Sequence, residues 1–273
     1  MDKFEQFKSL HKKGDALVLL NCWDAASARF IELSGAMAIA TTSSGVSFSM
    51  GRPDGQGLRR DEMVDMVHRI VRSVSLPVTA DMERGYGTGS PEDCAESARQ
   101  ILEAGAIGLN LEDSPGDNGE ILVAAEFHAE RIRAIKQSAH SLGRDIFVNA
   151  RTDVFLRQYG ELDTWLSETI RRAGIFQDAG ADSIFVPGVV EIETISKLAS
   201  EIDLPLNVMA TPRTPNIYEL NEAGVSRISV GPFLQLKLMQ MLQSFSQELF
   251  ESGDFAKLDG ALSFAEVNAM FPR

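Results

Sequence analysis

Several residue types that indicate a particular chemistry are scarce in this chain of 273 residues, or lie where they cannot form the corresponding site. The only two cysteines, Cys22 and Cys94, match neither a disulfide framework nor the spacing of a thiolate metal site. No lysine lies at the end of an expected strand, which removes the nucleophile of a Schiff-base aldolase. The four histidines all fall in stretches that we expect to be helical. None of them is therefore a candidate base or metal ligand.

A basic surface and long apolar runs are missing as well. The formal net charge of −13 argues against nucleic-acid binding, because that requires clustered lysine and arginine. An anionic substrate remains compatible, since local arginines can dominate an acidic protein. No apolar run approaches the ~20 residues that span a bilayer, and residues 1–15 lack the apolar core of a signal peptide. We expect a soluble, cytoplasmic protein that binds no membrane.

Short strand patterns alternate with longer helical patterns along the whole chain. Eight strands are predicted, at Leu17–Leu20, Ala38–Thr41, Val78–Asp81, Gly108–Leu111, Ile146–Ala150, Ser183–Val186, Leu206–Val208 and Arg227–Ser229. The helices expected between them include 61–73, 91–104, 126–141, 164–178 and 191–201. This alternation favours an α/β fold, a single (β/α)8 TIM barrel over residues 1–273, with an open doubly wound sheet as the alternative. Residues 233–273 would form the eighth helix and a C-terminal extension.

Acidic residues gather where three of the predicted strands end. They are Asp81 and Glu83, then Glu112 and Asp113, and finally Asp153 beside Arg151. A parallel barrel brings such positions to one rim, the carboxyl ends of its strands, where ligands bind. Carboxylates gathered there repel one another unless a proton or a cation intervenes. Because oxygen ligands without histidine or thiol favour Mg²⁺ over zinc, we predict a Mg²⁺ site, with Mn²⁺ as a possible substitute. For any one of these residues, a helix cap or loop carboxylate is the alternative.

Neighbouring residues are candidates for holding a substrate carboxylate. The hydroxyl groups of Ser43 and Ser44 and the backbone amides around Gly45 follow the second predicted strand. Arg151 can add a bidentate clamp, although an internal ion pair with Asp153 or Glu112 is equally compatible with its position. The glycine-rich segment 85–89 does not have the spacing of a dinucleotide fingerprint, so we interpret it as a loop that approaches a ligand.

With these residues in view, the chain resembles the isocitrate lyase/phosphoenolpyruvate mutase superfamily. The resemblance rests on the order and spacing of NCWDAASARFIE, AIATTSSGVS, GRPDG, LPVTADMERGYG, AGAIGLNLEDS, FVNARTDVF, ADSIFVPG and PLNVMA. It implies a (β/α)8 barrel whose eighth helix is exchanged between subunits, giving a homodimer or homotetramer. It further implies Mg²⁺ nearest to Asp81, with Glu83, Glu112 and Asp54 holding its water shell. The substrate would be a small carboxylate held by Ser44, Gly45 and Arg151, and Asn207 of PLNVMA joins these substrate-binding candidates.

Two departures concern the residues that would choose the reaction. Isocitrate and methylisocitrate lyases carry a K-K-C-G-H loop after the fourth strand, whereas this chain reads SPGDNGEILVAAE there. The loop also lacks the lysine of the mutases and phosphonopyruvate hydrolases, and Asn118 matches their asparagine only loosely. The histidine of several members near the end of the sixth strand is replaced by the region of Val186-Pro187-Gly188. The scaffold and the metal site are kept while the acid/base residues differ.

These features lead to a main hypothesis and two alternatives. The main hypothesis is a Mg²⁺-dependent lyase or decarboxylase that cleaves a C–C bond in a small 2-oxo or 2-hydroxy acid through an enolpyruvate-like intermediate. Arg151 would stabilise charge, while Glu83, Glu112, Tyr86 or a metal-bound water would serve as the base. The alternatives are a phosphonopyruvate hydrolase or mutase acting on a C–P bond, and a barrel that binds 2-oxo acids without turnover.

Overall fold

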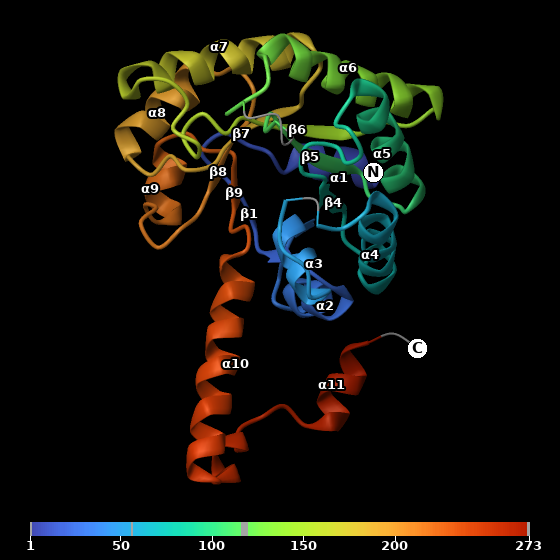
Figure 1. Ribbon diagram of the computed structural model, residues 1–273, viewed down its shortest axis with the longest axis vertical. Coiled ribbons are helices and arrows are strands. Elements are labelled where there is room, and N and C mark those ends of the chain that lie inside the picture. The colour runs from blue at the N-terminus through green and yellow to red at the C-terminus, as the bar shows by residue number, and fades with distance from the viewer. Residues whose placement is uncertain (1, 56, 116–119, 272–273) are drawn as a thin grey trace.

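The strands of the computed structural model form a parallel barrel, shown in Figure 1, and the structure describes residues 2–55, 57–115 and 120–271. The strands are β1 (Leu17–Leu19), β2 (Asn21–Cys22), β3 (Ile39–Thr41), β4 (Val78–Asp81), β5 (Gly108–Glu112), β6 (Phe147–Arg151), β7 (Ser183–Val186), β8 (Leu206–Met209) and β9 (Arg227–Ser229). Their order is β1-β9-β8-β7-β6-β5-β4-β3-β2. The predicted strand Leu17–Leu20 forms β1, which pairs with β9, and the unpredicted strand β2 follows it and pairs with β3. The segment 17–22 thereby closes the sheet, and the predicted α/β barrel is confirmed.

Helices lie around the barrel, and the five whose bounds were predicted, α4 to α8, agree with the prediction to within one residue at each end. The helices are α1 (Lys3–Ser9), α2 (Ala25–Leu33), α3 (Ser43–Ser49), α4 (Arg60–Ser73), α5 (Pro91–Glu103), α6 (Ala125–Ser141), α7 (Trp165–Asp178), α8 (Ile192–Glu201), α9 (Ile217–Glu222), α10 (Phe233–Ser252) and α11 (Phe264–Met270), with 3₁₀ turns η1 (Leu162–Thr164) and η2 (Phe255–Leu258). Ser90 caps α5 by accepting a hydrogen bond from the backbone N–H of Asp93 at 3.2 Å. The segment after β3 forms helix α3, for which no helix was predicted, and the expectation that His11 is helical was wrong, because it lies beyond the end of α1.

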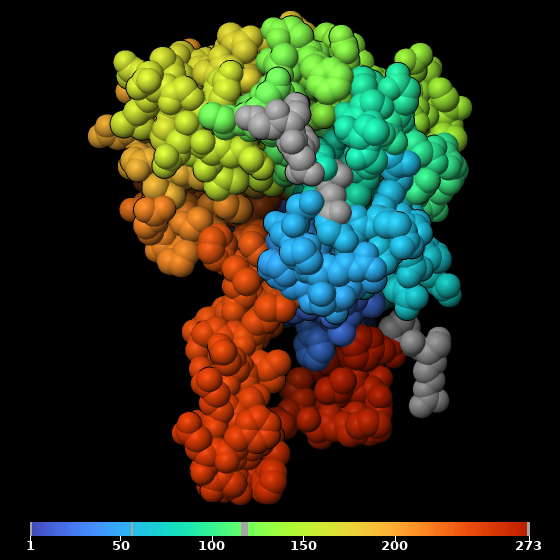
Figure 2. All heavy atoms as spheres, viewed as in Figure 1, coloured from blue at the N-terminus to red at the C-terminus, as the bar shows by residue number. Residues whose placement is uncertain are grey.

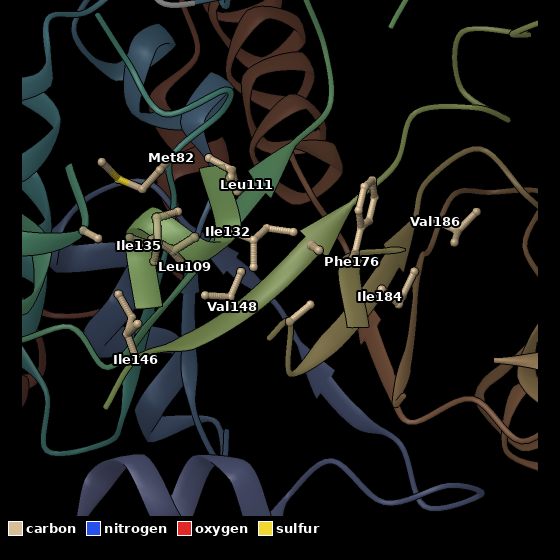
Figure 3. Close-up of a cluster of buried hydrophobic side chains, with 14 of the residues drawn as sticks. Met82, Leu109, Leu111, Ile132, Ile135, Ile146, Val148, Phe176, Ile184 and Val186 are labelled. Carbon is tan, nitrogen blue, oxygen red and sulfur yellow. The ribbon is translucent and has the colours of Figure 1, made fainter. Parts of the chain in front are cut away.

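The main hydrophobic core lies between the outer face of the strands and the ring of helices (Figure 3). Side chains of a strand alternate between its two faces, so every second residue of β5 to β7 points outward. The outward residues Leu109, Val148 and Ile184 are fully or almost fully buried, and they belong to one cluster with Ile132 of α6 and Phe176 of α7. This packing fixes the strands whose carboxyl ends carry the acidic residues.

A second, smaller cluster closes the amino end of the barrel. Phe7 of α1 lies against Phe147 at the start of β6, with ring centres 5.1 Å apart and the rings nearly perpendicular. The ring of His11 stacks on Phe147 at 4.4 Å, and its Nδ1 lies 2.9 Å from the carbonyl oxygen of Phe7. We call Phe7, His11 and Phe147 the floor of the barrel. The three rings therefore close the amino end of the barrel.

The C-terminal helix α10 leaves the barrel instead of packing along its side (Figures 1 and 2). Gln235 is its only buried residue, while apolar side chains such as Leu242 and Phe250 are 67% and 86% exposed. A capping box begins α11: Ser263 Oγ accepts from the backbone N–H of Glu266, and Glu266 Oε2 accepts from the backbone N–H of Ser263. Within the described residues, no helix combines the length and the apolar character required for crossing a membrane.

Candidate active site

Asp81, Glu112 and Arg151 are the last residues of the adjacent strands β4, β5 and β6. The register pairs Glu112 directly with Arg151, so both side chains point into the barrel mouth from neighbouring strands. The sequence prediction that these residues share one rim is consistent with this arrangement. The rim therefore holds opposite charges at its centre, with the acidic residues in excess.

Asp81 is held by the first residue of α3. Its Oδ2 accepts hydrogen bonds from the backbone N–H of Ser43 at 3.1 Å and from Ser43 Oγ at 2.8 Å. The backbone N–H of Asp81 donates to Thr41 Oγ1 at 2.8 Å. These bonds fix one oxygen of the carboxylate and leave Oδ1 for another ligand. Ser43 therefore supports Asp81, and its hydroxyl is already in use.

Ser44 and Gly45 lie in the buried first turn of α3. The hydroxyl of Ser44 is 3.0 Å from that of Thr42. A Cβ atom on Gly45 would come within 2.5 Å of Thr42 Cγ2 and 2.8 Å of Gln235 Oε1, so only glycine fits this position. The amides predicted to bind a carboxylate thus belong to a helical turn that is tightly packed against α10.

The loop after β4 has an unusual backbone. Glu83 and Tyr86 adopt positive φ angles of 49° and 60°, which side chains other than glycine rarely do. Both residues are buried, and Tyr86 Oη donates a long hydrogen bond of 3.4 Å to Glu83 Oε1. Burial, then the charges of Glu83 and Asp81, raise the pKa of Tyr86 well above its ordinary value. Tyr86 therefore keeps its proton at neutral pH and can act as a hydrogen-bond donor.

Glu112 and Arg151 form the charged centre of the rim. Glu112 Oε2 is 2.8 Å from Arg151 Nη1, and Ser114 Oγ donates to Glu112 Oε1. Burial raises the pKa of Glu112 to about 7, with the charges of Asp153 and Asp81 adding to the effect and Arg151 opposing it. The sequence analysis missed Ser114, although it ends the GLNLEDS motif. Glu112 can therefore exchange a proton near neutral pH.

Arg151 is also paired on its other side. Its Nε lies 2.6 Å from Asp153 Oδ1, and its Nη2 lies 3.0 Å from Asp153 Oδ2. Although burial opposes it, the charges of Glu112 and Asp153 raise the pKa of Arg151. Both internal ion pairs that the sequence left open are thus formed. A guanidinium has five N–H groups, so two of them stay available for a substrate.

Two acidic residues that the sequence grouped with the rim are structural. Asp153 is fully buried beneath Arg151. Asp113 is also fully buried, and its Oδ2 lies 2.9 Å from Arg172 Nη1 while its Oδ1 accepts from the backbone N–H of Asp153. Burial raises the pKa of Asp113 to about 6, against the charge of Arg172. These two carboxylates connect β5, β6 and α7 below the surface of the rim.

Three further candidates lie around this centre. Asp54 is exposed in the loop between α3 and α4. Partial desolvation of its carboxylate raises its pKa, the hydrogen bond from the backbone of Gly55 opposes this, and the charge of Asp81 raises it further. Asn207 is fully buried in β8. Asn118, which the resemblance matched loosely to a catalytic asparagine, falls outside the described residues.

The acidic residues of the rim suit a hard divalent cation. In the described ranges, no three histidine, cysteine or acidic side chains are close enough together to enclose a metal directly. Burial is the main cause of the raised pKa of Glu112 and of Asp54, and the negative charge of Asp81 adds to both shifts, so the carboxylates repel one another. A cation with its water shell would relieve this repulsion, and oxygen ligands spaced in this way suit Mg²⁺ better than zinc.

An α/β barrel with carboxylates and an arginine at its carboxyl rim is typical of enzymes that bind small ligands at that rim. Comparisons with known proteins give the family. The model of the phosphoenolpyruvate phosphomutase family matches residues 7–250, and the chain belongs to this family, within the isocitrate lyase/phosphoenolpyruvate mutase superfamily of carbon–carbon lyases and mutases.

Three relatives illustrate the range of the superfamily. A Burkholderia cenocepacia protein of solved structure, provisionally named a phosphonomutase, is 44% identical with a TM-score of 0.86, covering 90% of this chain and 100% of that one. The 2-methylisocitrate lyase of Bacillus subtilis is 29% identical over 77% of this chain and 68% of its own. Oxaloacetate decarboxylase 2 of Pseudomonas fluorescens is 27% identical over 68% of this chain and 63% of its own.

Proposed function

We propose that this protein is a Mg²⁺-dependent lyase or decarboxylase that cleaves a C–C bond in a small 2-oxo or 2-hydroxy carboxylic or dicarboxylic acid. The observation that carries the proposal is the joint position of Asp81, Glu112 and Arg151 at one rim. The names of the two curated relatives, a methylisocitrate lyase and an oxaloacetate decarboxylase, agree with this class of substrate.

The rim offers separate places for a metal and for a substrate. Asp81 would hold Mg²⁺, or Mn²⁺ as a substitute, with Glu83, Glu112 and Asp54 binding its water molecules. When bound, the metal would supply positive charge that stabilises an enolate oxygen. The two unused N–H groups of Arg151, the turn at Ser44 and Gly45, and the amide of Asn207 would hold the substrate's carboxylate.

The proton chemistry depends on the residues that replace the missing loop cysteine. Cleavage of a 2-hydroxy acid requires a base for the hydroxyl proton, and the raised pKa of Glu112, about 7, suits it to that role. Tyr86, with its high pKa, would stay protonated and donate a hydrogen bond to the developing negative charge. Decarboxylation depends less on acid/base residues, because CO₂ leaves without protonation of a carbon leaving group.

The decisive experiment is to measure the release of pyruvate and other 2-oxo acids from oxaloacetate, methylisocitrate, substituted malates and phosphonopyruvate. Each compound is tested with Mg²⁺ and with a chelator. Oxaloacetate loses CO₂ spontaneously in the presence of metal, so the Asp81→Ala protein provides the background. Metal-dependent release from one carbon substrate above that background supports the proposal, whereas full activity of Asp81→Ala contradicts the assignment of the metal site.

A C–P bond enzyme is the second candidate, because the matching family model is that of the phosphomutases. A phosphoryl group in transfer usually needs a cation beside it, and no lysine stands in the sequence between Glu112 and Ala125. Release of phosphate together with pyruvate from phosphonopyruvate would establish this alternative. Binding of 2-oxo acids without any turnover would instead indicate a barrel that only binds its ligand.

We further propose that two chains exchange α10 in a homodimer, which can pair into a homotetramer. The exposed apolar side chains of α10 exceed what a monomer leaves in water. A groove of about 280 Å³ beside α2, lined by Phe30, Ile31 and Leu238, is the surface that a second copy would fill. Light scattering after chromatography tests this: the wild type should be at least dimeric, and Leu242→Glu should shift it toward monomer. A monomeric wild type would contradict the proposal.

A further inference from the structure

The middle of the barrel interior is polar, where a barrel of this type usually has bulky aliphatic side chains. The inward-facing polar residues of this layer are Asn110, Asn149, Ser183, Asn207, Arg227 and Ser229, all with exposed fractions of 5% or less. They come from the five adjacent strands β5 to β9 and lie between the floor and the rim. Polar groups this deeply buried must satisfy one another, so their hydrogen bonds show how the interior is organised.

The six side chains form one continuous chain of hydrogen bonds. Ser183 Oγ donates to Asn149 Oδ1 at 2.6 Å, and Asn149 Nδ2 donates to Asn110 Oδ1 at 2.8 Å. The same oxygen accepts from Arg227 Nη2 at 3.2 Å. On the other side, Arg227 Nε donates to Ser229 Oγ at 3.3 Å, and Ser229 Oγ donates to Asn207 Oδ1 at 3.2 Å. Arg227 is therefore the link between the two halves.

Arg227 is a buried cation without an ion pair. Among the described residues, no carboxylate lies within ion-pairing distance of its guanidinium, and its Nη1 has no hydrogen-bond acceptor. The guanidinium lies 5.9 Å from the ring centre of Phe7 in the floor. Burial lowers the pKa of Arg227 to about 9, against the attraction of Asp81, so it remains charged at neutral pH. A charge buried in this way is unfavourable unless it has a role, because its desolvation is only partly offset.

The guanidinium determines the direction of the hydrogen bonds. An arginine side chain can only donate, whereas a serine hydroxyl or an asparagine amide can also accept. Ser229 accepts from Arg227 and donates its own proton to Asn207 Oδ1, so the oxygen of the Asn207 amide lies toward Ser229. The opposite end of that amide, Nδ2, has no partner in the described part of the chain and is completely buried.

We propose that Arg227 is a positioning residue for the substrate carboxylate: by fixing the direction of this hydrogen-bond chain, it makes Asn207 present its N–H₂ group, and not its oxygen, to the ligand. The inference rests on the proposed function, in which Asn207 binds the substrate. A carboxylate can only accept hydrogen bonds, so an amide turned the other way would repel it. Arg227 contacts neither substrate nor metal in this scheme and acts through Ser229 and Asn207.

The test compares two replacements of Arg227. Arg227→Met fills a similar space without any donor, whereas Arg227→Lys keeps a cation that can only donate. Binding of oxalate in the presence of Mg²⁺, measured by calorimetry, should weaken about tenfold in Arg227→Met and about threefold or less in Arg227→Lys. A side chain needed only for packing would give the reverse order. Circular dichroism and a thermal melt confirm that each variant is folded.

A double-mutant cycle shows whether the effect passes through Asn207. Arg227→Met combined with Asn207→Ala should bind oxalate no more weakly than Asn207→Ala alone, because both changes remove the same N–H donor. Independent, additive losses would overturn the inference, as would wild-type affinity in Arg227→Met. The affinity for Mg²⁺ without oxalate should stay within about twofold of wild type, because Arg227 is not a metal ligand.

A crystal structure of unliganded Arg227→Met separates this inference from the proposed function. If wild-type protein does not bind oxalate with Mg²⁺, the proposed function fails. The orientation of the Asn207 amide in the crystal structure of Arg227→Met then tests the role of Arg227 independently. Rotation of Ser229, with Asn207 turned or present in two orientations, supports the inference. Hydrogen bonds unchanged from wild type around Asn207 would overturn it.

Discussion

At the amino ends of the strands, three rings fill the barrel, whereas at the carboxyl ends carboxylates and an arginine line its mouth. In the floor, Phe7 and His11 pack on Phe147, and burial, with the charge of Arg227 adding to it, lowers the pKa of His11 to about 3. At the rim, burial raises the pKa of Glu112 to about 7. The same strands thus end in a packed, uncharged region on one side and a charged region on the other. We infer that the floor contributes stability and the rim contributes chemistry.

The largest expected effect is on the rim. Asp81→Asn should lower kcat/KM about a thousandfold, roughly 4 kcal/mol of transition-state stabilisation, because the electrostatic centre of the site is lost. The rise in melting temperature that Mg²⁺ gives the wild type should disappear in the variant. Steady-state kinetics and thermal melts with and without Mg²⁺ measure both effects.

The matched control is Asp178→Asn, which makes the same change at an exposed position of α7. It should leave activity and the Mg²⁺ effect as they are in the wild type. If Asp81→Asn kept its response to Mg²⁺, the metal would have to bind elsewhere on the protein.

The floor should respond in the opposite way. Phe147→Ala removes a buried ring that contacts Phe7 and His11, and it should lower the free energy of unfolding by about 3 kcal/mol or somewhat more. The activity of the remaining folded protein should change less than about twofold, because no substrate group reaches the floor. Urea unfolding and active-site-normalised kinetics test this. The control Leu162→Ala, at a side chain 74% exposed, should be nearly neutral. If Phe147→Ala lost activity while its stability stayed unchanged, the floor would take part in catalysis.

His11 makes the contribution of the floor to stability fall at low pH, which the rim does not share. Its pKa is about 3 in the folded protein, so the folded state stays uncharged while the unfolded chain takes up a proton below pH 6.5. Stability is therefore present above pH 6.5 and is lost as the pH falls, by roughly 2 kcal/mol from this residue at pH 5. Urea unfolding at pH 7 and pH 5 should show a smaller loss in His11→Asn, which can keep the hydrogen bond to Phe7.

The control for this change is His68→Asn, because His68 is exposed on α4. Its difference between the two pH values should equal that of the wild type. An unchanged pH dependence in His11→Asn would show that the ring of His11 is protonated in the folded state.

The smallest expected effects come from two glycines. Gly45→Ala should destabilise the protein by about 1–2 kcal/mol and weaken oxalate binding, because the new methyl group displaces Thr42 or Gln235 beside the rim. Gly174→Ala, within α7 and with no atom closer than 4 Å to the added Cβ, should stabilise by up to about 1 kcal/mol. Differential scanning calorimetry compares the pair. If the two variants had equal stability, the close packing of α3 around Gly45 would not be a feature of the site.

The sequence predicted the positions of the rim better than its contacts. Asp81, Glu112 and Arg151 could be placed because a parallel barrel brings the carboxyl ends of its strands together. Helix α3 could not be predicted, because serine and glycine are poor helix formers and the turn is fixed by the bond from Ser43 to Asp81. The positive φ angle of Tyr86 carries no sequence signal either, since it depends on the packing around a residue that is not glycine.

The interior was the least predictable part of the molecule. Arg227 was recognised as the first residue of a strand, but a single charged residue gives no indication of whether it faces the interior or the solvent. Its hydrogen bond to Asn110 exists only because β5 and β9 lie on the same closed barrel, although the two residues are 117 positions apart in sequence. Such contacts depend on the complete topology, so no local pattern contains them.

The most direct test of the division between rim and floor is calorimetric titration of oxalate into four samples. They are the wild type with Mg²⁺, the wild type with a chelator, Asp81→Asn with Mg²⁺, and Phe147→Ala with Mg²⁺. We expect oxalate to bind the first and the fourth with similar affinity and to bind neither of the other two. Binding that persists with the chelator or in Asp81→Asn, or that is lost only in Phe147→Ala, would contradict a metal-dependent carboxylate site at the rim.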